Sequence, residues 1–156
     1  MNRLKEIRKE NNMYQKDIAK ILNMSQTGYS QYEVETHDIP TEILKNIANY
    51  YNVNIDYLLY ITNNKIAYTR SIIKNENNIK NFNRLKEIRE DRDLTQFDIA
   101  KILNMSRSGY SQYETGVNDI PTKILKELAY YYDVSIDYLL YMTDDRKCHT
   151  KIKKEI

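Results

Sequence analysis

The sequence predicts an all-α protein of two tandem five-helix domains joined by a linker, and three observations support this fold class. Residues 2–62 align with residues 83–143 without a gap, and 41 of the 61 aligned pairs are identical. Each copy carries apolar residues at helical spacing, and neither shows the alternating pattern of a β-strand. Each copy holds several helices, and two copies are too few for a solenoid.

The duplication sets the expected domain boundaries. We expect a first domain over 1–62, a linker over 63–82, a second domain over 83–143 and a basic C-terminal tail over 144–156. The first domain holds 7 basic and 8 acidic residues, and the second holds 8 basic and 10 acidic residues. The linker holds 4 basic residues and 1 acidic residue, and the tail holds 5 basic and 3 acidic residues. The excess positive charge therefore lies in the connectors, where it either keeps them solvated or attracts a polyanion non-specifically.

Composition and segment lengths exclude several classes of protein. Charged residues make up 29% of the chain and hydrophobic residues 41%, which is typical of globular rather than disordered chains. Apolar stretches such as 57–61 are far shorter than the roughly 20 residues of a membrane-spanning helix. The opening residues lack the apolar core of a signal peptide, and the single cysteine, Cys148, cannot form an internal disulfide. We expect a cytoplasmic protein that does not contact a membrane.

The first two helices follow from apolar spacing in the first copy. Leu4 and Ile7 predict the inner face of a helix that ends near Glu10. A second helix is predicted from Gln15, and its inward residues are Ile18, Ala19, Ile21 and Leu22. Asn23 then interrupts the pattern, and asparagine tolerates the left-handed conformation that ends helices.

Capping residues delimit the remaining three helices. Ser25 is a favourable N-cap for a third helix that runs to about Glu33, only about three residues after the second helix. Thr41 is expected to cap a fourth helix, and Asn54, or Ser135 in the second copy, a fifth.

Two helices joined by so short a turn form a helix-turn-helix arrangement. From Gln15 to Glu33 the residues read Gln-x-x-Ile-Ala-x-x-Leu-x-x-Ser-x-x-x-Tyr-Ser-x-Tyr-Glu, which resembles the phage-repressor and Cro-type (XRE-like) helix-turn-helix family. The later segments Pro-Thr-x-x-Leu-x-x-(Ile/Leu)-Ala and Ile-Asp-Tyr-Leu-Leu resemble the fourth and fifth helices of that family. The resemblance implies a transcriptional regulator that binds double-stranded DNA sequence-specifically, with its third helix in the major groove.

The third helix divides into two faces at about 100° per residue. One face is polar, with side chains short enough to approach base edges. Its members are Gln26, Thr27, Ser30 and Gln31 in the first copy, and Arg107, Ser108, Ser111 and Gln112 in the second copy. We call these residues the polar arc. The opposite face holds Gly28, Tyr29 and Tyr32, which we expect to pack inward, with Gly28 close to the second helix. Stacking of the tyrosines on bases is the alternative.

The polar arc differs between the copies at its first two positions, where Gln26 and Thr27 correspond to Arg107 and Ser108. Glutamine pairs bidentately with adenine, and arginine with guanine. Our hypothesis is that the two domains bind half-sites that share one base preference and differ at another. The alternative is drift on an exposed surface.

Contacts to phosphates are expected at the start of the second helix, where backbone N–H groups attract anions. The resemblance implies that Gln15 and Gln96 touch the DNA backbone there, and Lys16 adds a charge that its counterpart Phe97 lacks. Ser25 and Ser106 complete the set of expected DNA-binding residues. The resemblance also implies ion pairs that tie the first helix to the end of the third, Arg8 with Glu33 and Arg89 with Glu114.

Several residues depart from the family pattern. The loops 34–38 and 115–119 contain no Lys or Arg, which predicts modest affinity per domain and a shallow salt dependence. The first copy has Tyr14 where Thr95 is a good N-cap, and Glu35 where Gly116 suits a left-handed helix end. We therefore expect the second domain to be the more stable.

Two copies in one chain also suggest a covalent dimer. Family members commonly bind half-sites about 34 Å apart as dimers, and a 20-residue linker spans up to about 66 Å. Residues of the fifth helices are candidate contacts in a homodimer or an intramolecular pseudo-dimer, namely Tyr57, Leu58, Tyr60, Tyr138, Leu139 and Tyr141. The alternative is that they cover the core of their own domain.

Other functional classes find less support in the sequence. His37 has no suggested carboxylate partner and corresponds to Asn118, and three glycines form no phosphate-binding loop. We expect no catalysis, cofactor or metal. The alternative function is a protein-interaction module, antitoxin-like or an adaptor, with weak or no DNA binding.

Overall fold

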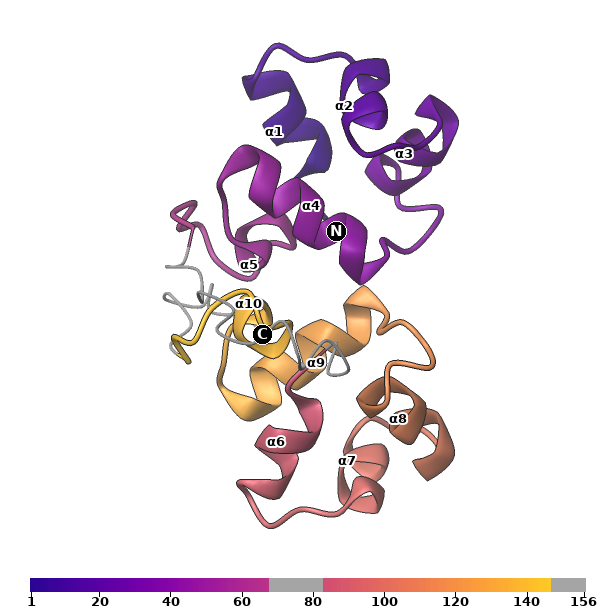
Figure 1. Cartoon of the computed structure of the whole chain (residues 1–156), viewed down its shortest axis with the longest axis vertical. Coiled ribbons are helices and arrows are strands. Elements are labelled where there is room, and N and C mark those ends of the chain that lie inside the picture. The colour runs from indigo at the N-terminus through magenta and orange to yellow at the C-terminus, as the bar shows by residue number, and fades with distance from the viewer. Residues whose placement is uncertain (68–82, 147–156) are drawn as a thin grey trace, which may run out of the picture. The chain divides into compact units, whose positions relative to one another are not determined.

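The computed structural model describes residues 1–67 and 83–146, and these form two compact units, 1–67 and 83–146. Within the described residues the protein has ten helices and no strand, apart from an isolated bridge between Val53 and Ile66. Five of these helices belong to each unit, and Figure 1 labels them. The predicted all-α fold of two five-helix domains is therefore confirmed. None of the described helices is long and apolar enough to cross a membrane.

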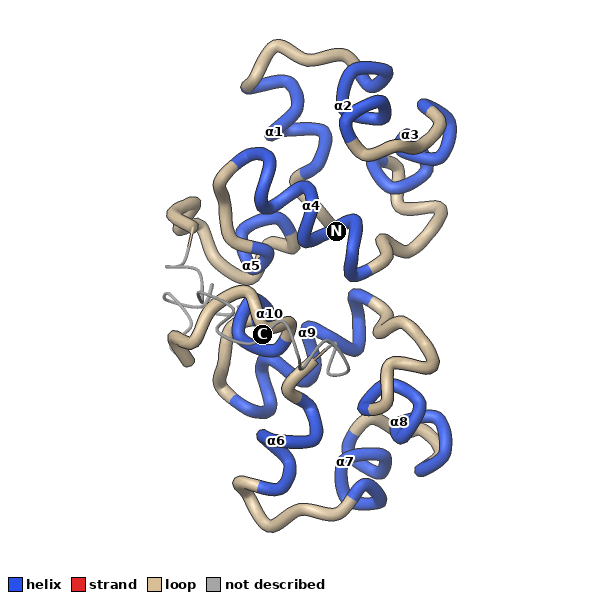
Figure 2. The backbone as a smooth tube through the Cα atoms, viewed as in Figure 1, coloured by secondary structure: helices blue, strands red, loops and turns tan. Residues whose placement is uncertain are grey.

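The helices follow the same order in both units (Figure 2). The first unit consists of α1 (Leu4–Glu10), α2 (Gln15–Ile21), α3 (Gln26–Glu33), α4 (Thr41–Tyr51) and α5 (Ile55–Leu58). The second consists of α6 (Leu85–Glu90), α7 (Gln96–Ile102), α8 (Arg107–Glu114), α9 (Thr122–Tyr132) and α10 (Ile136–Leu139). Each predicted helix is therefore present in both copies.

The core of each unit consists of the apolar residues that the helical spacing identifies. In the first unit every helix contributes fully buried side chains, among them Leu4, Ile18, Tyr29, Leu44 and Leu58. The prediction that Ile21 points inward is wrong, because this side chain and its counterpart Ile102 are exposed. The buried face of α2 is centred between Ile18 and Ala19, and Ile21 lies about 100° away from that centre.

The ends of the helices mostly follow the predicted caps. Asn23 has a φ of 55° and ends α2 in the left-handed conformation. The hydroxyl of Ser25 accepts a hydrogen bond from the Gly28 N–H at 3.1 Å, and the Asn54 side chain accepts one from the Tyr57 N–H. The prediction that Thr41 caps α4 is wrong. Pro40 occupies the N-cap position in an extended conformation, so Thr41 is already the first helical residue.

The close neighbours of Gly28 also differ from expectation. A Cβ atom at this position would lie 3.2 Å from Met24 Cε and 3.2 Å from Ser25 Oγ. Both neighbours belong to the turn before α3, so the expected close approach to α2 is wrong. The glycine leaves room for the N-cap and for the apolar side chain that precedes it.

The first residues of the predicted linker form hydrogen bonds with the first unit. The first residues of the predicted tail form an ion pair with the second unit. The Asn54 amide donates to the carbonyls of Asn64 and Ile66 at 2.8 and 2.7 Å. In the second unit, Arg146 Nη2 lies 2.6 Å from Asp91 Oδ2. Cys148 and the rest of the linker and tail lie outside the described residues.

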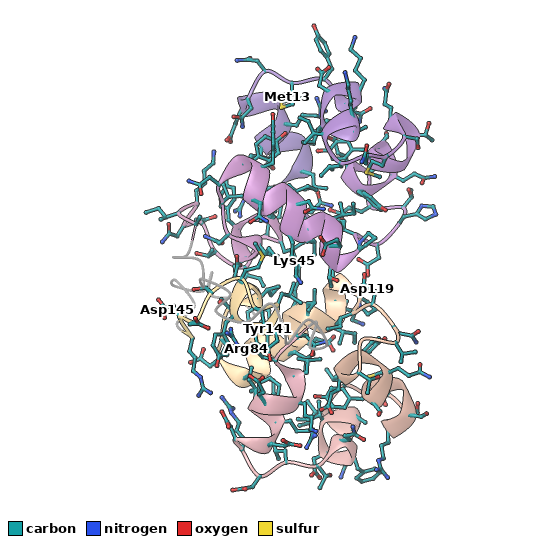
Figure 3. The ribbon with its side chains drawn as sticks, in the orientation of Figure 1. Met13, Lys45, Arg84, Asp119, Tyr141 and Asp145 are labelled. Carbon is teal, nitrogen blue, oxygen red and sulfur yellow. The ribbon has the colours of Figure 1, made fainter. Side chains whose placement is uncertain are left out.

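The tyrosines in and just after α5 and α10 stack on an arginine of their own unit. The guanidinium of Arg3 lies 4.4 Å from the ring centre of Tyr57 and 3.9 Å from that of Tyr60. The second unit repeats this arrangement, with the Arg84 guanidinium 4.3 Å from the ring centres of both Tyr138 and Tyr141. Figure 3 labels Arg84 and Tyr141. Leu58 and Leu139 are buried. These contacts favour the alternative that the fifth helices cover their own core, and a role in dimerisation stays a prediction.

Candidate nucleic-acid interface

Each unit holds its third helix with a buried Arg–Glu–Gln triad. In the first unit Arg8 pairs with Glu33, with Nε 2.5 Å from Oε1 and Nη2 3.0 Å from Oε2. Gln15 Nε2 donates to the same carboxylate at 2.9 Å. The Glu33 side chain is only 1% exposed. Because the three residues come from α1, α3 and α2, the triad fixes α3 against both preceding helices.

The second unit contains the same triad with nearly identical geometry. Arg89 lies 2.6 Å from Glu114 Oε1, and Gln96 Nε2 donates to Oε2 at 3.0 Å. The predicted ion pairs are therefore confirmed in both units. The glutamine was predicted as a phosphate contact only, and its bond to the buried carboxylate was missed by sequence reasoning.

The triad carboxylates stay ionised. Burial alone would raise the pKa of Glu33, but the hydrogen bonds from Arg8 and Gln15 and the charge of Arg8 outweigh it and lower the pKa. The pKa of Glu114 is lowered for the same reasons, with Arg89 and Gln96 as its partners. Helices α3 and α8 are thus each anchored by a carboxylate that does not titrate near neutral pH.

The polar arc lies on the outer side of the anchored helix. Gln26 and Thr27 are exposed, and within the described residues their side chains form no hydrogen bond. Arg107 is likewise exposed and has no ion-pair partner among the residues that the structure describes. These side chains are therefore available to a ligand without breaking an internal contact.

The structure brings part of the expected phosphate site next to the arc. Gln15 Nε2 lies 3.4 Å from Ser30 Oγ, and the equivalent atoms of Gln96 and Ser111 are also 3.4 Å apart. Lys16 is exposed, with its ammonium 5.5 Å from the ring centre of Tyr14. The N-terminal end of α2 and the polar arc of α3 therefore share one surface.

The N-cap serines have a structural role. Ser25 and Ser106 each accept a hydrogen bond from the backbone N–H three residues later, at 3.1 Å. Ser108 Oγ lies 3.2 Å from Ser106 Oγ, and its counterpart Thr27 forms no such contact within the described residues. Contacts of these serines with DNA stay predictions.

Two features near the polar arc were not predicted from the sequence. The first is the exposure of two aromatic rings at the start of α2 and α7, since Tyr14 is 71% and Phe97 63% exposed. The second is a hydrogen bond between the side chains of Asn118 and Gln112, which links the loop after α8 to the arc. The signal for this bond in the sequence was only that Asn118 replaces His37.

Two helices joined by a short turn, α2 with α3 and α7 with α8, and a polar outer face on the second helix of each pair make this a helix-turn-helix protein. The helix-turn-helix family model matches residues 4–58 and 85–139, and the chain belongs to this family. No solved structure matches the chain.

The chain is similar to several curated bacterial proteins. It is 42% identical over 57 residues to the HTH-type transcriptional regulator ImmR of Bacillus subtilis, covering 36% of this chain and 45% of that protein. It is 39% identical over 62 residues to the uncharacterized HTH-type transcriptional regulator YobD of the same species, covering 40% and 55%. It is also 29% identical over 75 residues to the antitoxin PezA of Streptococcus pneumoniae, covering 44% and 48%. The chain thus spans about half the length of these relatives.

Proposed function

We propose that the chain is a sequence-specific, double-stranded-DNA-binding transcriptional regulator whose helices α3 and α8 enter the major groove. The observation that carries this proposal is the exposure of Gln26, Thr27 and Arg107, whose side chains have no partner within the described residues, on helices that the triads hold in place. A rigid helix with uncommitted Gln and Arg side chains suits readout of base edges. The two relatives named as transcriptional regulators support the same function.

The proposal includes joint binding by the two units. Neither loop after α3 or α8 contains a Lys or Arg, so each unit offers few cations to phosphates. A second unit on the same chain raises the effective concentration at an adjacent half-site without adding any contact. A covalent pseudo-dimer therefore offsets the modest affinity of each unit.

Binding of the full-length protein to labelled duplex DNA over a range of salt concentrations tests the proposal. We expect binding that weakens as salt rises. The double variant Gln26→Ala with Arg107→Ala should remove the preference at the base pair that each of these residues faces and leave the preference due to Gln31 and Gln112. The control is Lys123→Ala, which removes one positive charge from an exposed site on α9. Absence of duplex binding at every salt concentration would contradict the proposal.

A second candidate is a protein-interaction module with weak or no DNA binding. The exposed rings of Tyr14 and Phe97 favour it, as does the similarity to a protein named as an antitoxin. The same titration separates the candidates, because this function predicts no salt-dependent binding to duplex DNA.

A further inference from the structure

The last residue of the polar arc is held differently in the two units. In the second unit Asn118 Nδ2 donates to Gln112 Oε1 at 2.6 Å, and the Asn118 backbone N–H donates to the Gln112 carbonyl at 3.2 Å. In the first unit the Gln31 side chain forms no hydrogen bond within the described residues. The corresponding loop residue, His37, only brings its backbone N–H to 3.5 Å from the Gln31 carbonyl.

The backbones of the two loops are similar, although the Thr36 N–H of the first unit also donates to the Gln31 carbonyl at 3.1 Å, a bond without counterpart at Val117 among the described residues. Both loops leave the helix through a left-handed residue, Glu35 with a φ of 61° and Gly116 with a φ of 68°. In both units the backbone N–H two residues later, that of His37 or Asn118, points at the carbonyl of the last arc residue, Gln31 or Gln112. The clearest difference lies in the side chain that follows, because the Asn118 amide reaches Gln112 Oε1, whereas the His37 ring forms no hydrogen bond within the described residues.

A glutamine that reads adenine needs both ends of its amide, since Oε1 accepts from the base amino group and Nε2 donates to the ring nitrogen. The Asn118 bond occupies one of the two lone pairs of Gln112 Oε1 and leaves the other lone pair and both N–H groups for a base. In the flipped orientation of Gln112, Nε2 faces Asn118 and the contact is kept only if the Asn118 amide turns as well. Gln112 is therefore oriented before DNA arrives, whereas Gln31 must be ordered by the DNA.

We propose that Asn118 is a positioning residue that makes the second unit the more selective reader at the base that Gln112 faces. Gln31 reads the corresponding base of the other half-site less selectively. This inference rests on the proposed function, because it requires that α3 and α8 bind DNA. Ordering a flexible side chain on binding costs enough free energy to change discrimination by roughly two- to tenfold.

The reciprocal exchange of the two loop residues tests the inference in the full-length protein. A duplex selected from a random library is first varied at each base pair, and the pair whose preference Gln112→Ala removes is the one that Gln112 faces. The ratio of affinities for the preferred and substituted pair is then measured. Asn118→His should lower this ratio about two- to tenfold, and His37→Asn should raise the ratio at the Gln31 position by a similar factor.

Matched controls separate positioning from a general effect on the fold. Val117→Ala alters an exposed neighbour in the same loop and should leave the ratio unchanged. Asn118→Asp keeps the shape but removes the N–H donor, so it should lower the ratio as Asn118→His does. Equal loss of affinity for all duplexes, with unchanged ratios, would show a merely structural role and overturn the inference. Wild-type protein that binds no duplex would contradict the proposed function, and the inference with it.

Discussion

The first and second units support their third helices with the same contacts but present different side chains on them. The triads Arg8–Glu33–Gln15 and Arg89–Glu114–Gln96 agree closely in geometry. On the outer face, by contrast, Gln26 corresponds to Arg107. Replacing the arginine or the glutamate of a triad would leave its buried partner without the ion pair. The exposed arc carries no such penalty, so the ligand it binds can differ while the fold is kept.

The units also differ in the residues that end their helices. Thr95 caps α7, because its hydroxyl accepts from the Asp98 N–H at 3.2 Å, whereas the Tyr14 side chain makes no cap for α2. Glu35 adopts the left-handed conformation at a cost that Gly116 avoids. These differences support the expectation that the second unit is the more stable.

Removal of a triad carboxylate gives the largest expected effect and tests whether the two scaffolds are equivalent. Glu114→Ala removes the buried ion-pair partner of Arg89, leaves only the exposed Glu90 at 3.4 Å, and should destabilise the second unit by about 3–5 kcal/mol. Glu33→Ala should do the same to the first unit. Hydrogen exchange of the full chain, resolved by peptide, measures each unit separately.

The control for these variants is Glu90→Ala, because Glu90 is an exposed partner of Arg89 at 3.4 Å. We expect less than about 1 kcal/mol from its removal. A loss of similar size for Glu90 and Glu114 would show that the triad is not what anchors the helix.

The exchange of the first arc residue tests whether the two units differ in base preference. Gln26→Arg should shift the first half-site toward guanine, with a discrimination of about 1–3 kcal/mol at one base pair. Arg107→Gln should make the opposite change in the second half-site. Competition binding with duplexes varied at that pair measures the shift, and identical preferences for wild type and variant would contradict the assignment.

The helix caps give a smaller effect and test the difference in stability. Tyr14→Thr restores the cap that Thr95 provides and should stabilise α2 by about 1 kcal/mol. Thr95→Tyr should destabilise α7 by a similar amount. Slower exchange of the α2 amides in the first variant and faster exchange of the α7 amides in the second are the expected results. No change in either helix would mean that the cap does not explain the difference.

The smallest expected effect concerns phosphate contacts. Phe97→Lys places a cation where the first unit has Lys16 and should steepen the slope of log K against log[salt] by about 0.9. Lys16→Phe should reduce the slope equally. If both variants keep the wild-type slope, the start of α2 and α7 does not contact phosphates.

Much of the fold could be predicted because apolar spacing and capping residues are local signals. Ser25 and Asn54 cap the helices that the sequence assigns to them. Ile21 was misplaced because its exposure depends on which side of a short helix meets the core, which spacing alone leaves open. The bond between Asn118 and Gln112 was missed because it depends on the path of the loop, and that path is not encoded in helical periodicity.

Selection of duplex sites from a random library by the full-length protein at low salt tests the central claim most directly. We expect two unlike half-sites about one helical turn apart, with guanine favoured at the base pair that Arg107 faces and adenine at the one that Gln26 faces. Two identical half-sites would contradict the assignment of these residues. No enrichment of any sequence would contradict the claim that the two units read DNA.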